Sequence, residues 1–481
     1  MYTRKIDTFQ GQIKMALKEA IPDLDLTLAK VFQTLRIRSH LTGAGIRKCE
    51  GYAAGHLIFS MFTSIFLTLP GLCGYAHLNL TALTTASKDA FYRLKNRDLG
   101  WRSFFWRFLG FLAQQLGWSQ QAPAETFFVL DTSILPKRGE KIEEVSYVYD
   151  HSRGRSVLGY ELLTLLLVNP QGYYPLDFEY HFSSKKGKAY QEATVAHSRS
   201  SLVRRRREAT KNKLAVSLQM LQRAQAKGIK ALYVLVDRWF ASPTFFNNLL
   251  MLGLHGIGRL KRGQSRYLYQ GQEYTLEELY RRVRPNLIRH RALGYDLARL
   301  EVTCANGLPG IIVFSRGYRE PEVNQPAGAK LPPQPKWAAF FTTDASLATD
   351  EVVKKYLCRW SIEVFFKEAK TLLGLGKDQS RKFAAQVCAT TLTFLRFNVL
   401  AFVKAQRDAA ETIGSIFREL AAEVRRFTFQ EKIIAYFRQF LDAILELLNQ
   451  STPLSANSRD FLDIIDIVIN ELDLCRGAKL E

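Results

Sequence analysis

The sequence predicts an α/β protein in which an α/β core and a strand-rich segment lie between two helical regions. Residues 1–118 repeat apolar side chains at spacings of three and four, as amphipathic helices do. Continuous apolar runs follow that fit buried strands, with one charged helical segment before the last of them. Residues 255–343 then change to short strands and turns, and helical patterns return after them.

The composition limits which classes of protein this chain can belong to and which kind of partner it can bind. A chain of 481 residues is long enough for several domains, and a hydrophobic content of 47% excludes an intrinsically disordered protein. The chain has 67 lysines and arginines against 45 acids, a formal net charge of +22. Such an excess indicates a polyanionic partner, most simply nucleic acid, with an anionic membrane as the rival.

The most apolar run, residues 57–69, argues against the membrane. It reaches only about two-thirds of the length that spans a bilayer, and Pro70 ends it, so we expect a buried helix. The six cysteines are scattered without a C-x-x-C pair, and the N-terminus carries no secretion signal. We therefore expect a protein of the reducing cytoplasm.

A short basic helix is predicted near the end of the N-terminal region. Ser87 is a suitable N-cap, and Lys88 and Arg93 follow it in the sequence KDAFYRLKN. This segment fits the recognition helix of a helix-turn-helix-like domain that binds DNA. It fits a solvated basic helix equally well.

Four apolar segments predict the strands of the core. They are TFFVLD (126–131), GYELLTLLLVNP (159–170), YYPLDFEYHF (173–182) and KALYVLVD (230–237). Asp131 and Asp237 are each the first charged residue after such a run. Acids at the carboxyl edge of a sheet lie where α/β folds build their sites.

A third acid, Glu363, lies in the predicted helix YLCRWSIEVFFKEAK (356–370). At about 100° per residue, the polar residues of this helix fall on one narrow stripe. The stripe consists of Tyr356, Arg359, Glu363, Lys367 and Lys370. Three carboxylates brought together would repel one another unless cations bridge them, and Mg²⁺ suits such oxygen ligands. Two ions about 4 Å apart could then serve phosphoryl transfer.

Each acid also has a structural interpretation. Asp131 could be a turn or cap residue, and Asp237 could form a surface ion pair with Arg238. Glu363 could be held by Arg359 or Lys367 as an ordinary helix salt bridge.

Residues Tyr356, Arg359, Glu363 and Lys370 form the pattern Y-(2)-R-(3)-E-(6)-K. This pattern resembles the signature of DDE transposases from bacterial insertion sequences of the IS-four type. The resemblance covers roughly residues 120–375 and implies an RNase H-like catalytic core. It implies that Asp131, Asp237 and Glu363 bind two Mg²⁺ ions, with Mn²⁺ as a substitute.

The sequence also predicts a domain layout. The resemblance implies an RNase H-like core that a β-rich insertion domain interrupts before the motif helix, whereas the helical DNA-binding domain in front of it is inferred from charge and position. A helical C-terminal region takes the place where relatives form dimers. The expected boundaries are 1–118, 119–254, 255–343, 344–383 and 384–481.

Several basic and aromatic residues are candidates for DNA contact. Tyr356, Arg359, Lys367 and Lys370 can bind phosphates near the reacting bond, and Arg238 lies beside Asp237. By resemblance, Trp337 is a stacking platform for a base displaced from the duplex, although it also fits a core residue. The run Arg204, Arg205, Arg206 and Arg207 could follow a DNA backbone or form a solvated helix face.

The function expected from these observations is cut-and-paste DNA transposition in the bacterial cytoplasm. Its partners would be double-stranded DNA, as terminal inverted repeats and target, and a second copy of the chain. Two alternatives stay open: an inactive, domesticated DNA-binding protein, and an RNase H-fold nuclease that cuts without joining.

Overall fold

The computed structural model describes residues 26–49, 51–67, 86–150, 153–182, 200–317, 337–407 and 411–428. The chain forms two compact units. The first unit combines residues 1–100 with 407–481, and the second is residues 101–406. The second unit holds most of the predicted functional residues.

The first unit is mostly helical in its described part. The predicted apolar helix is confirmed as α4 (Ala54–Thr63) followed by η1 (Ser64–Leu67), and its residues are buried or half-buried. It is not purely helical, because β1 (Lys48–Cys49) and β2 (Tyr52–Ala53) form an antiparallel pair. The remaining elements are α2 (Thr27–Thr34), α3 (Ile37–Gly43), α6 (Lys88–Asn96) and a helix over residues 413–428. Of the predicted C-terminal region, residues 408–410 and 429–481 lie outside the described residues.

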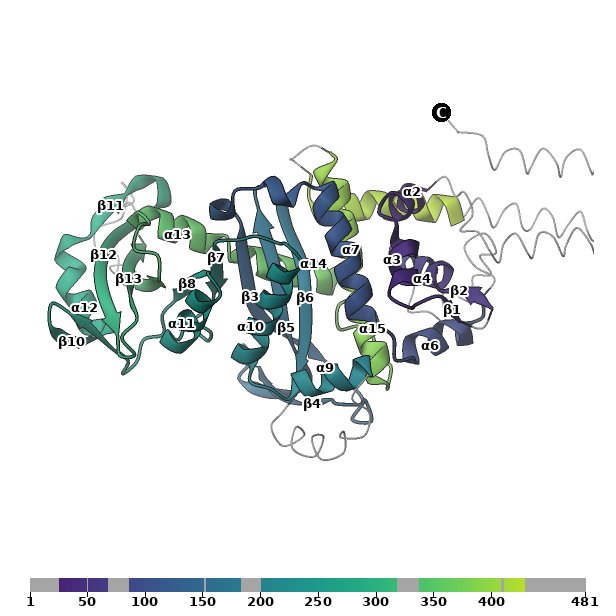
Figure 1. The fold of residues 1–481 in the computed structure, drawn as a ribbon, viewed down its shortest axis with the longest axis horizontal. Coiled ribbons are helices and arrows are strands. Elements are labelled where there is room, and N and C mark those ends of the chain that lie inside the picture. Colours follow the sequence, from purple (N-terminus) through teal and green to yellow (C-terminus); the bar gives the residue numbers. More distant parts are fainter. Residues whose placement is uncertain are drawn as a thin grey trace, which may run out of the picture. The chain divides into compact units, whose positions relative to one another are not determined.

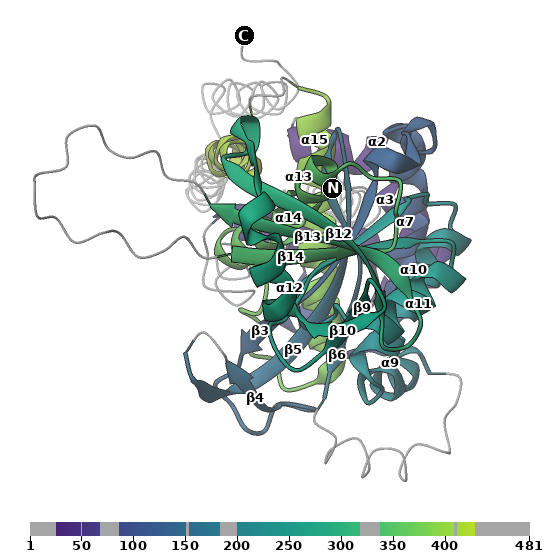
Figure 2. The ribbon, with the colours of Figure 1, turned by 90° about the vertical axis from the view of Figure 1, so that its left-hand side faces the viewer.

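A mixed sheet of twelve strands organises the second unit (Figures 1 and 2). The four predicted core strands are confirmed. They are β3 (Phe127–Pro136), β5 (Arg155–Asn169), β6 (Gly172–His181) and β7 (Tyr233–Val236). Strand β7 lies between β3 and β8 (His255–Arg259) and is parallel to both, whereas the other pairings are antiparallel. Figure 2 shows the strands fanning out, as expected for a twisted sheet.

Helices cover both faces of this sheet. On one face, α10 (Lys213–Ala226) contacts β5, β6 and α11 (Pro243–Met251). The other face carries α13 (Thr349–Leu357), α14 (Trp360–Thr371) and α15 (Phe383–Ala405). Helix α9 (Ser201–Ala209) packs on β6, and a break at residues 210–212 separates it from α10, where the sequence predicted one helical segment.

Helix α7 (Trp101–Gln115) belongs to the second unit, although the expected layout assigned residues 101–118 to the N-terminal domain. Its apolar side is buried against the core, where the Phe105 ring lies 6.1 Å from that of Phe394 on α15. Burial of these rings stabilises the attachment of α7.

The strand-rich segment continues the core sheet. Strand β8 pairs with β7 on one side and with β14 (Trp337–Thr342) on the other. The further strands of the segment are β9 (Arg266–Tyr269), β10 (Gln272–Thr275), β11 (Ile288–His290), β12 (Tyr295–Cys304) and β13 (Pro309–Gly317). The remaining strand of the sheet, β4 (Ser146–Asp150), lies outside this segment and pairs with β5. The segment also contains α12 (Leu276–Val283), which the strand-and-turn prediction missed.

Helix α15 is a core helix by its burial. It has 23 residues and is apolar enough to cross a membrane by length and composition alone. Within this structure, however, 94% of its most apolar window is buried, and it packs on β6, α7 and α14.

Candidate active site

The parallel pairing of β3 and β7 places Asp131 beside Asp237. Leu130 is opposite Val236 in this register, so the next residue on each strand is an aspartate. The carboxyl ends of parallel strands are where α/β proteins build their sites, and Asp237 follows the end of β7 as predicted. Asp131 was also predicted to end its strand, but β3 continues to Pro136, so only its parallel pairing with β7 ends there. The chain therefore brings together two acids that are far apart in sequence.

Both aspartates lie on the face of the sheet that carries α13 and α14. A Cβ atom at Gly258 would lie 2.9 Å from Val236 Cγ2 and 2.8 Å from Phe246 of α11. The side chain of Val236, and that of any residue at position 258, therefore lies on the face of the sheet that α11 covers. Side chains alternate along a strand, so Asp237 and Asp131, the next residues, point to the opposite face.

Glu363 and Arg359 complete a charged cluster with Asp131. Arg359 Nη1 donates to Asp131 Oδ2 at 3.1 Å, and Nη2 donates to Glu363 Oε1. The predicted helix salt bridge between Arg359 and Glu363 is thus present, and it extends to a strand residue. The helix predicted over residues 356–370 is not continuous, because Arg359 occupies a tight turn between α13 and α14, where Arg359 N donates to Tyr356 O at 2.9 Å.

Electrostatics indicate that the three acids are close to one another. Burial raises the pKa of Asp131 to about 7, and the negative charges of Asp237 and Glu363 add to that increase. Arg359 and the amide of Thr132, which donates to Asp131 Oδ1 at 2.7 Å, act in the opposite direction. A carboxylate with this surplus of negative neighbours would gain from a further cation.

Asp237 is held by backbone amides. Trp239 N donates to Asp237 Oδ1 at 2.9 Å and Phe240 N at 3.3 Å, which fixes the carboxylate at the end of β7. Arg238 is exposed, and no ion pair joins it to Asp237 in the described part of the chain. Among the described residues, no hydrogen bond reaches the second oxygen of Asp237.

The other residues of the predicted stripe differ in environment. Tyr356 is buried against the ring of Phe340 at 4.6 Å, and burial raises its pKa. Lys370 Nζ donates to Ile134 O on β3 at 3.0 Å, and burial lowers its pKa. Lys367 is exposed. Lys370 therefore ties α14 to β3 in this structure, and only Lys367 points into open solvent.

Sequence reasoning missed Arg259, which ends β8. Val236 is opposite Gly258, so the next residues, Asp237 and Arg259, are level with each other on neighbouring chain segments. Arg259 is exposed. On its other side Arg259 pairs with Phe340, the residue on which Tyr356 packs. The rule that found the aspartates, the first charged residue after an apolar strand, would have found Arg259 in HGIGR.

Trp337 is less available for stacking than the sequence suggested. Its ring stacks on Tyr280 at 4.3 Å, and the Arg262 guanidinium lies 4.0 Å from it. These two groups together reduce the indole surface that is open to a base. Trp239 and Trp360, which flank the acid cluster in sequence, are 51% and 61% exposed.

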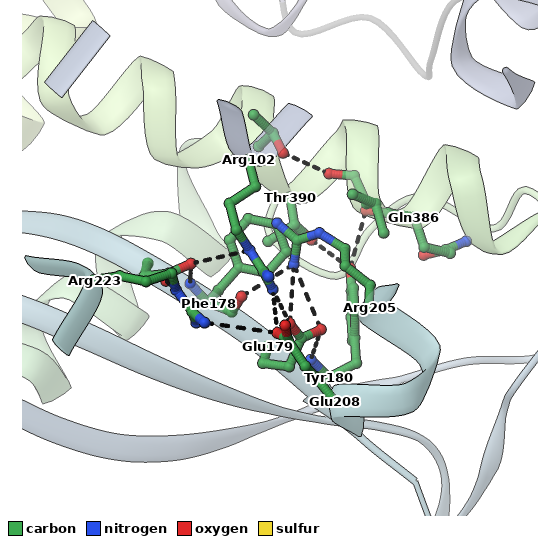
Figure 3. Close-up of polar contacts among 12 residues, drawn as sticks. Arg102, Phe178, Glu179, Tyr180, Arg205, Glu208, Arg223, Gln386 and Thr390 are labelled. Carbon is green, nitrogen blue, oxygen red and sulfur yellow. Dashed lines mark hydrogen bonds and ion pairs between the residues drawn. The ribbon is translucent and has the colours of Figure 1, made fainter. Parts of the chain in front are cut away.

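The four arginines of α9 differ from the predicted DNA-binding surface. Arg205 is 2% exposed, donates to Phe178 O at 3.1 Å and pairs with Glu179 (Figure 3). Arg206 pairs with Glu143 at 3.0 Å and Glu144 at 3.2 Å. These two arginines therefore form ion pairs with acids of the protein itself, which are distant in the sequence and could not be inferred from the residues around RRRR. Arg204 is exposed and Arg207 half-buried.

The predicted basic helix of the first unit is α6, and it begins after Ser87 as expected. Lys88 and Arg93 are both exposed on it. Its buried side consists of Ala90, Phe91, Leu94 and Lys95.

The oxygen donors of the acid cluster suit a hard divalent cation. Asp131, Asp237 and Glu363 are the residues that would hold it, and such an ion would offset both the burial and the neighbouring negative charges that raise the pKa of Asp131. Across the described ranges, no group of three His, Cys, Asp or Glu side chains is already gathered tightly enough to hold a metal. The Arg359 guanidinium bonds to Asp131 and Glu363 instead.

Comparison with protein families adds an independent finding. Residues 78–287 match the model described as "DDE superfamily endonuclease". This part of the chain is therefore similar to DDE-type endonuclease domains. It contains Asp131 and Asp237 and ends before Glu363.

The other comparisons add little. A search of curated proteins finds no match. Among solved structures, the Drosophila P element transposase strand transfer complex aligns with 11% identity and a TM-score of 0.21. That alignment covers 53% of this chain and 55% of the other, so the chain spans about half the length of that transposase.

Proposed function

We propose that this protein is a cut-and-paste DNA transposase of the IS-four type whose reactions take place at Asp131, Asp237 and Glu363. The observation that carries the proposal is the register of β3 and β7, which sets two acids side by side, together with the effect of Glu363 on Asp131. The family match over residues 78–287 supports an endonuclease reaction. The Y-(2)-R-(3)-E-(6)-K pattern supports the narrower class.

The three acids would hold two Mg²⁺ ions, which when bound supply an activated nucleophile and stabilise the leaving oxygen. The amides of Trp239 and Phe240 orient Asp237 for this role. Arg359, which links Asp131 and Glu363, keeps the strand and the helix aligned. It also offers a guanidinium of a shape that suits a phosphate.

The reaction sequence consists of repeated in-line phosphoryl transfers. Water first cuts one strand at the element end, and the freed 3′-hydroxyl attacks the opposite strand to close a hairpin. Water then reopens the hairpin, and the 3′-hydroxyl joins target DNA. Each step exchanges one phosphodiester oxygen for another, so one site serves all four.

The surroundings of the site support substrate binding. Exposed Arg259 and Arg238 lie next to the acids, so a DNA phosphate there would meet two cations. A displaced base could stack more readily on Trp337 after Tyr280 or Arg262 moves, since both lie against its ring. We place the protein in the bacterial cytoplasm, acting as a dimer on terminal repeats and target DNA.

The test is cleavage and joining of labelled DNA ends by the full chain with Mg²⁺, in parallel with an EDTA control. The changes Asp131→Asn, Asp237→Asn and Glu363→Gln keep the size of each side chain and remove its charge. Each should lower strand cleavage by at least about 100-fold. Cleavage that survives all three changes would remove these residues from the mechanism.

Two other outcomes separate the alternatives. Metal-dependent cleavage without joining would identify a nuclease, the activity that the family description names. DNA binding without cleavage under any metal would identify an inactive DNA-binding protein.

A further inference from the structure

A second arginine-rich segment lies on α12 and the chain that follows it. Between residues 281 and 291 the sequence RRVRPNLIRHR contains five arginines and no acid. All five are exposed. They are called the arginine surface below: Arg281, Arg282, Arg284, Arg289 and Arg291.

The scaffold under these arginines is well fixed. Leu276, Leu279 and Val283 bury one side of α12, and Thr275 caps its start through a reciprocal hydrogen-bond pair with Glu278. Strand β11 then pairs antiparallel with β12, and η4 (Arg284–Asn286) and η5 (Arg291–Leu293) flank it. The arginines therefore project from a folded element.

The protein neutralises little of this charge. Arg282 lies over the Tyr274 ring at 4.2 Å, and Arg289 is 3.7 Å from Asp296, which Arg316 also binds at 2.7 Å. Among the described residues, no ion pair or hydrogen bond engages the side chains of Arg281, Arg284 or Arg291. Glu278, an acid close to Arg281, already accepts bonds from Thr275 at 2.7 and 2.9 Å.

Further cations extend the surface. Hydrogen bonds from Thr275 lower the pKa of Glu278, and Arg266 and Arg281 add to this effect, so both arginines lie near that carboxylate. Arg266 is itself exposed on β9. Like charges placed this close repel one another unless a polyanion binds them.

We propose that the arginine surface binds the phosphate backbone of double-stranded DNA. Arginine rather than lysine fits this role, because its planar guanidinium can bond two phosphate oxygens at once. The inference rests on the proposed function, since DNA is then the substrate, and it adds a binding surface on α12 and β11. An anionic membrane is the competing ligand, and the single exposed apolar residue of the segment, Ile288, is a small anchor for it.

The experiment uses the full chain carrying Arg281→Gln, Arg284→Gln and Arg291→Gln together. Its binding to a labelled mixed-sequence duplex is measured by fluorescence anisotropy across a salt series. Loss of three phosphate contacts should reduce the slope of log K against log salt by about 2 to 3 and weaken binding more than about tenfold at moderate salt. Unchanged circular dichroism and an unchanged Tm would show that the variant is folded.

A matched control removes the same charge elsewhere in the second unit. Arg107, Lys227 and Lys230 are exposed on other elements, and their triple change to Gln should leave the slope within about one of wild type. Equal losses in both triple variants would overturn the proposal, because bulk charge would then explain the binding. A triple change of the arginine surface to Lys should retain most of the slope.

Two further measurements separate this proposal from its neighbours. If the triple Gln variant of the arginine surface lost binding to phosphatidylserine vesicles while its DNA binding was unchanged, the ligand of the surface would be a membrane, and the inference would be overturned. Wild-type cleavage of DNA together with an unaltered salt slope in the arginine variant would also overturn it, while the proposed function stands. A reduced slope in a protein that never cuts DNA would support the surface and reject the transposase.

Discussion

Two arginine-rich segments of the second unit, α9 and the arginine surface, have similar composition and opposite environments. In α9, Arg205 and Arg206 meet acids from β6 and from residues 143–144. On α12 and β11, Arg289 meets an aspartate that it shares with Arg316 and Arg282 lies over a tyrosine ring, while no ion pair engages Arg281, Arg284 or Arg291 among the described residues. The comparison teaches that the role of an arginine run is decided by which acids the fold places opposite it.

The α9 side of this comparison is a network of three arginines and three acids, of which Arg205, Asp177 and Glu179 are buried and the others half-buried (Figure 3). Arg102 of α7 binds Glu208 at 2.8 Å and also pairs with Glu179, while Arg223 of α10 binds Asp177 at 2.8 Å. The network joins three helices to strand β6. Its formal charges cancel, so it offers little attraction to a polyanion.

The largest expected effect comes from breaking this network at Arg205. The change Arg205→Ala leaves Glu179 buried with one partner fewer, which should cost about 3–5 kcal/mol of unfolding free energy. All six tryptophans lie between residues 101 and 360, so tryptophan fluorescence during urea unfolding reports on the second unit. The control is its exposed neighbour, with Arg204→Ala expected to change stability by less than about 0.5 kcal/mol. Equal effects of the two changes would contradict the comparison.

A smaller effect with a defined pH dependence is expected at Glu208. Burial alone would raise its pKa, but Arg102 and Arg223 lower it below the usual 4.5. A lowered folded pKa stabilises the protein above about 4.5, and this contribution is lost as pH falls through the folded value. Glu208→Gln should therefore cost about 1–3 kcal/mol at pH 7 and progressively less on acidification.

The control for Glu208 is Glu277, an exposed acid on α12. Glu277→Gln should leave the pH dependence of urea unfolding as in wild type. A Glu208→Gln variant whose deficit is the same at every pH would mean that the ion pair with Arg102 does not contribute through charge.

Local pattern was enough to predict the strands and the two aspartates. The first part of β3, most of β5 and all of β7 are buried on both faces, so they are continuous apolar runs. The first charge after the run marks the carboxyl end of β7, whereas Asp131 lies inside β3, which continues to Pro136. Parallel pairing then makes neighbours of Asp131 and Asp237. Helix spacing offered Arg359 or Lys367 as a partner of Glu363, and the structure shows the pair with Arg359, which precedes α14.

Contacts between distant segments were not predictable in this way. Arg205 meets Glu179 because α9 packs on β6, and nothing near RRRR in the sequence shows that. Trp337 was recognised as an aromatic residue of interest, but Tyr280 and Arg262 cover it only once α12 and β14 are placed. Helix α12 itself had a readable signal, the capping box TLEE, within a segment interpreted as strands.

The next expected effect concerns the support of the arginine surface. Thr275→Ala removes the N-cap of α12 and should cost about 1 kcal/mol, seen as faster hydrogen exchange in residues 279–283. The salt slope of DNA binding should stay as in wild type, because every arginine retains its charge. Loss of slope in this variant would mean that the cap, and with it the helix geometry, sets the phosphate contacts.

The smallest effect on stability, and the sharpest contrast with Arg205, is expected for Arg284→Gln. Because its exposed side chain makes no ion pair or hydrogen bond among the described residues, unfolding free energy should change by less than about 0.5 kcal/mol. The same change should lower the salt slope of DNA binding by about 1. Arg204→Gln, equally exposed but beside the α9 network, should change neither quantity. A stability loss above about 1 kcal/mol at Arg284 would reveal a structural partner and make the two arginine segments alike.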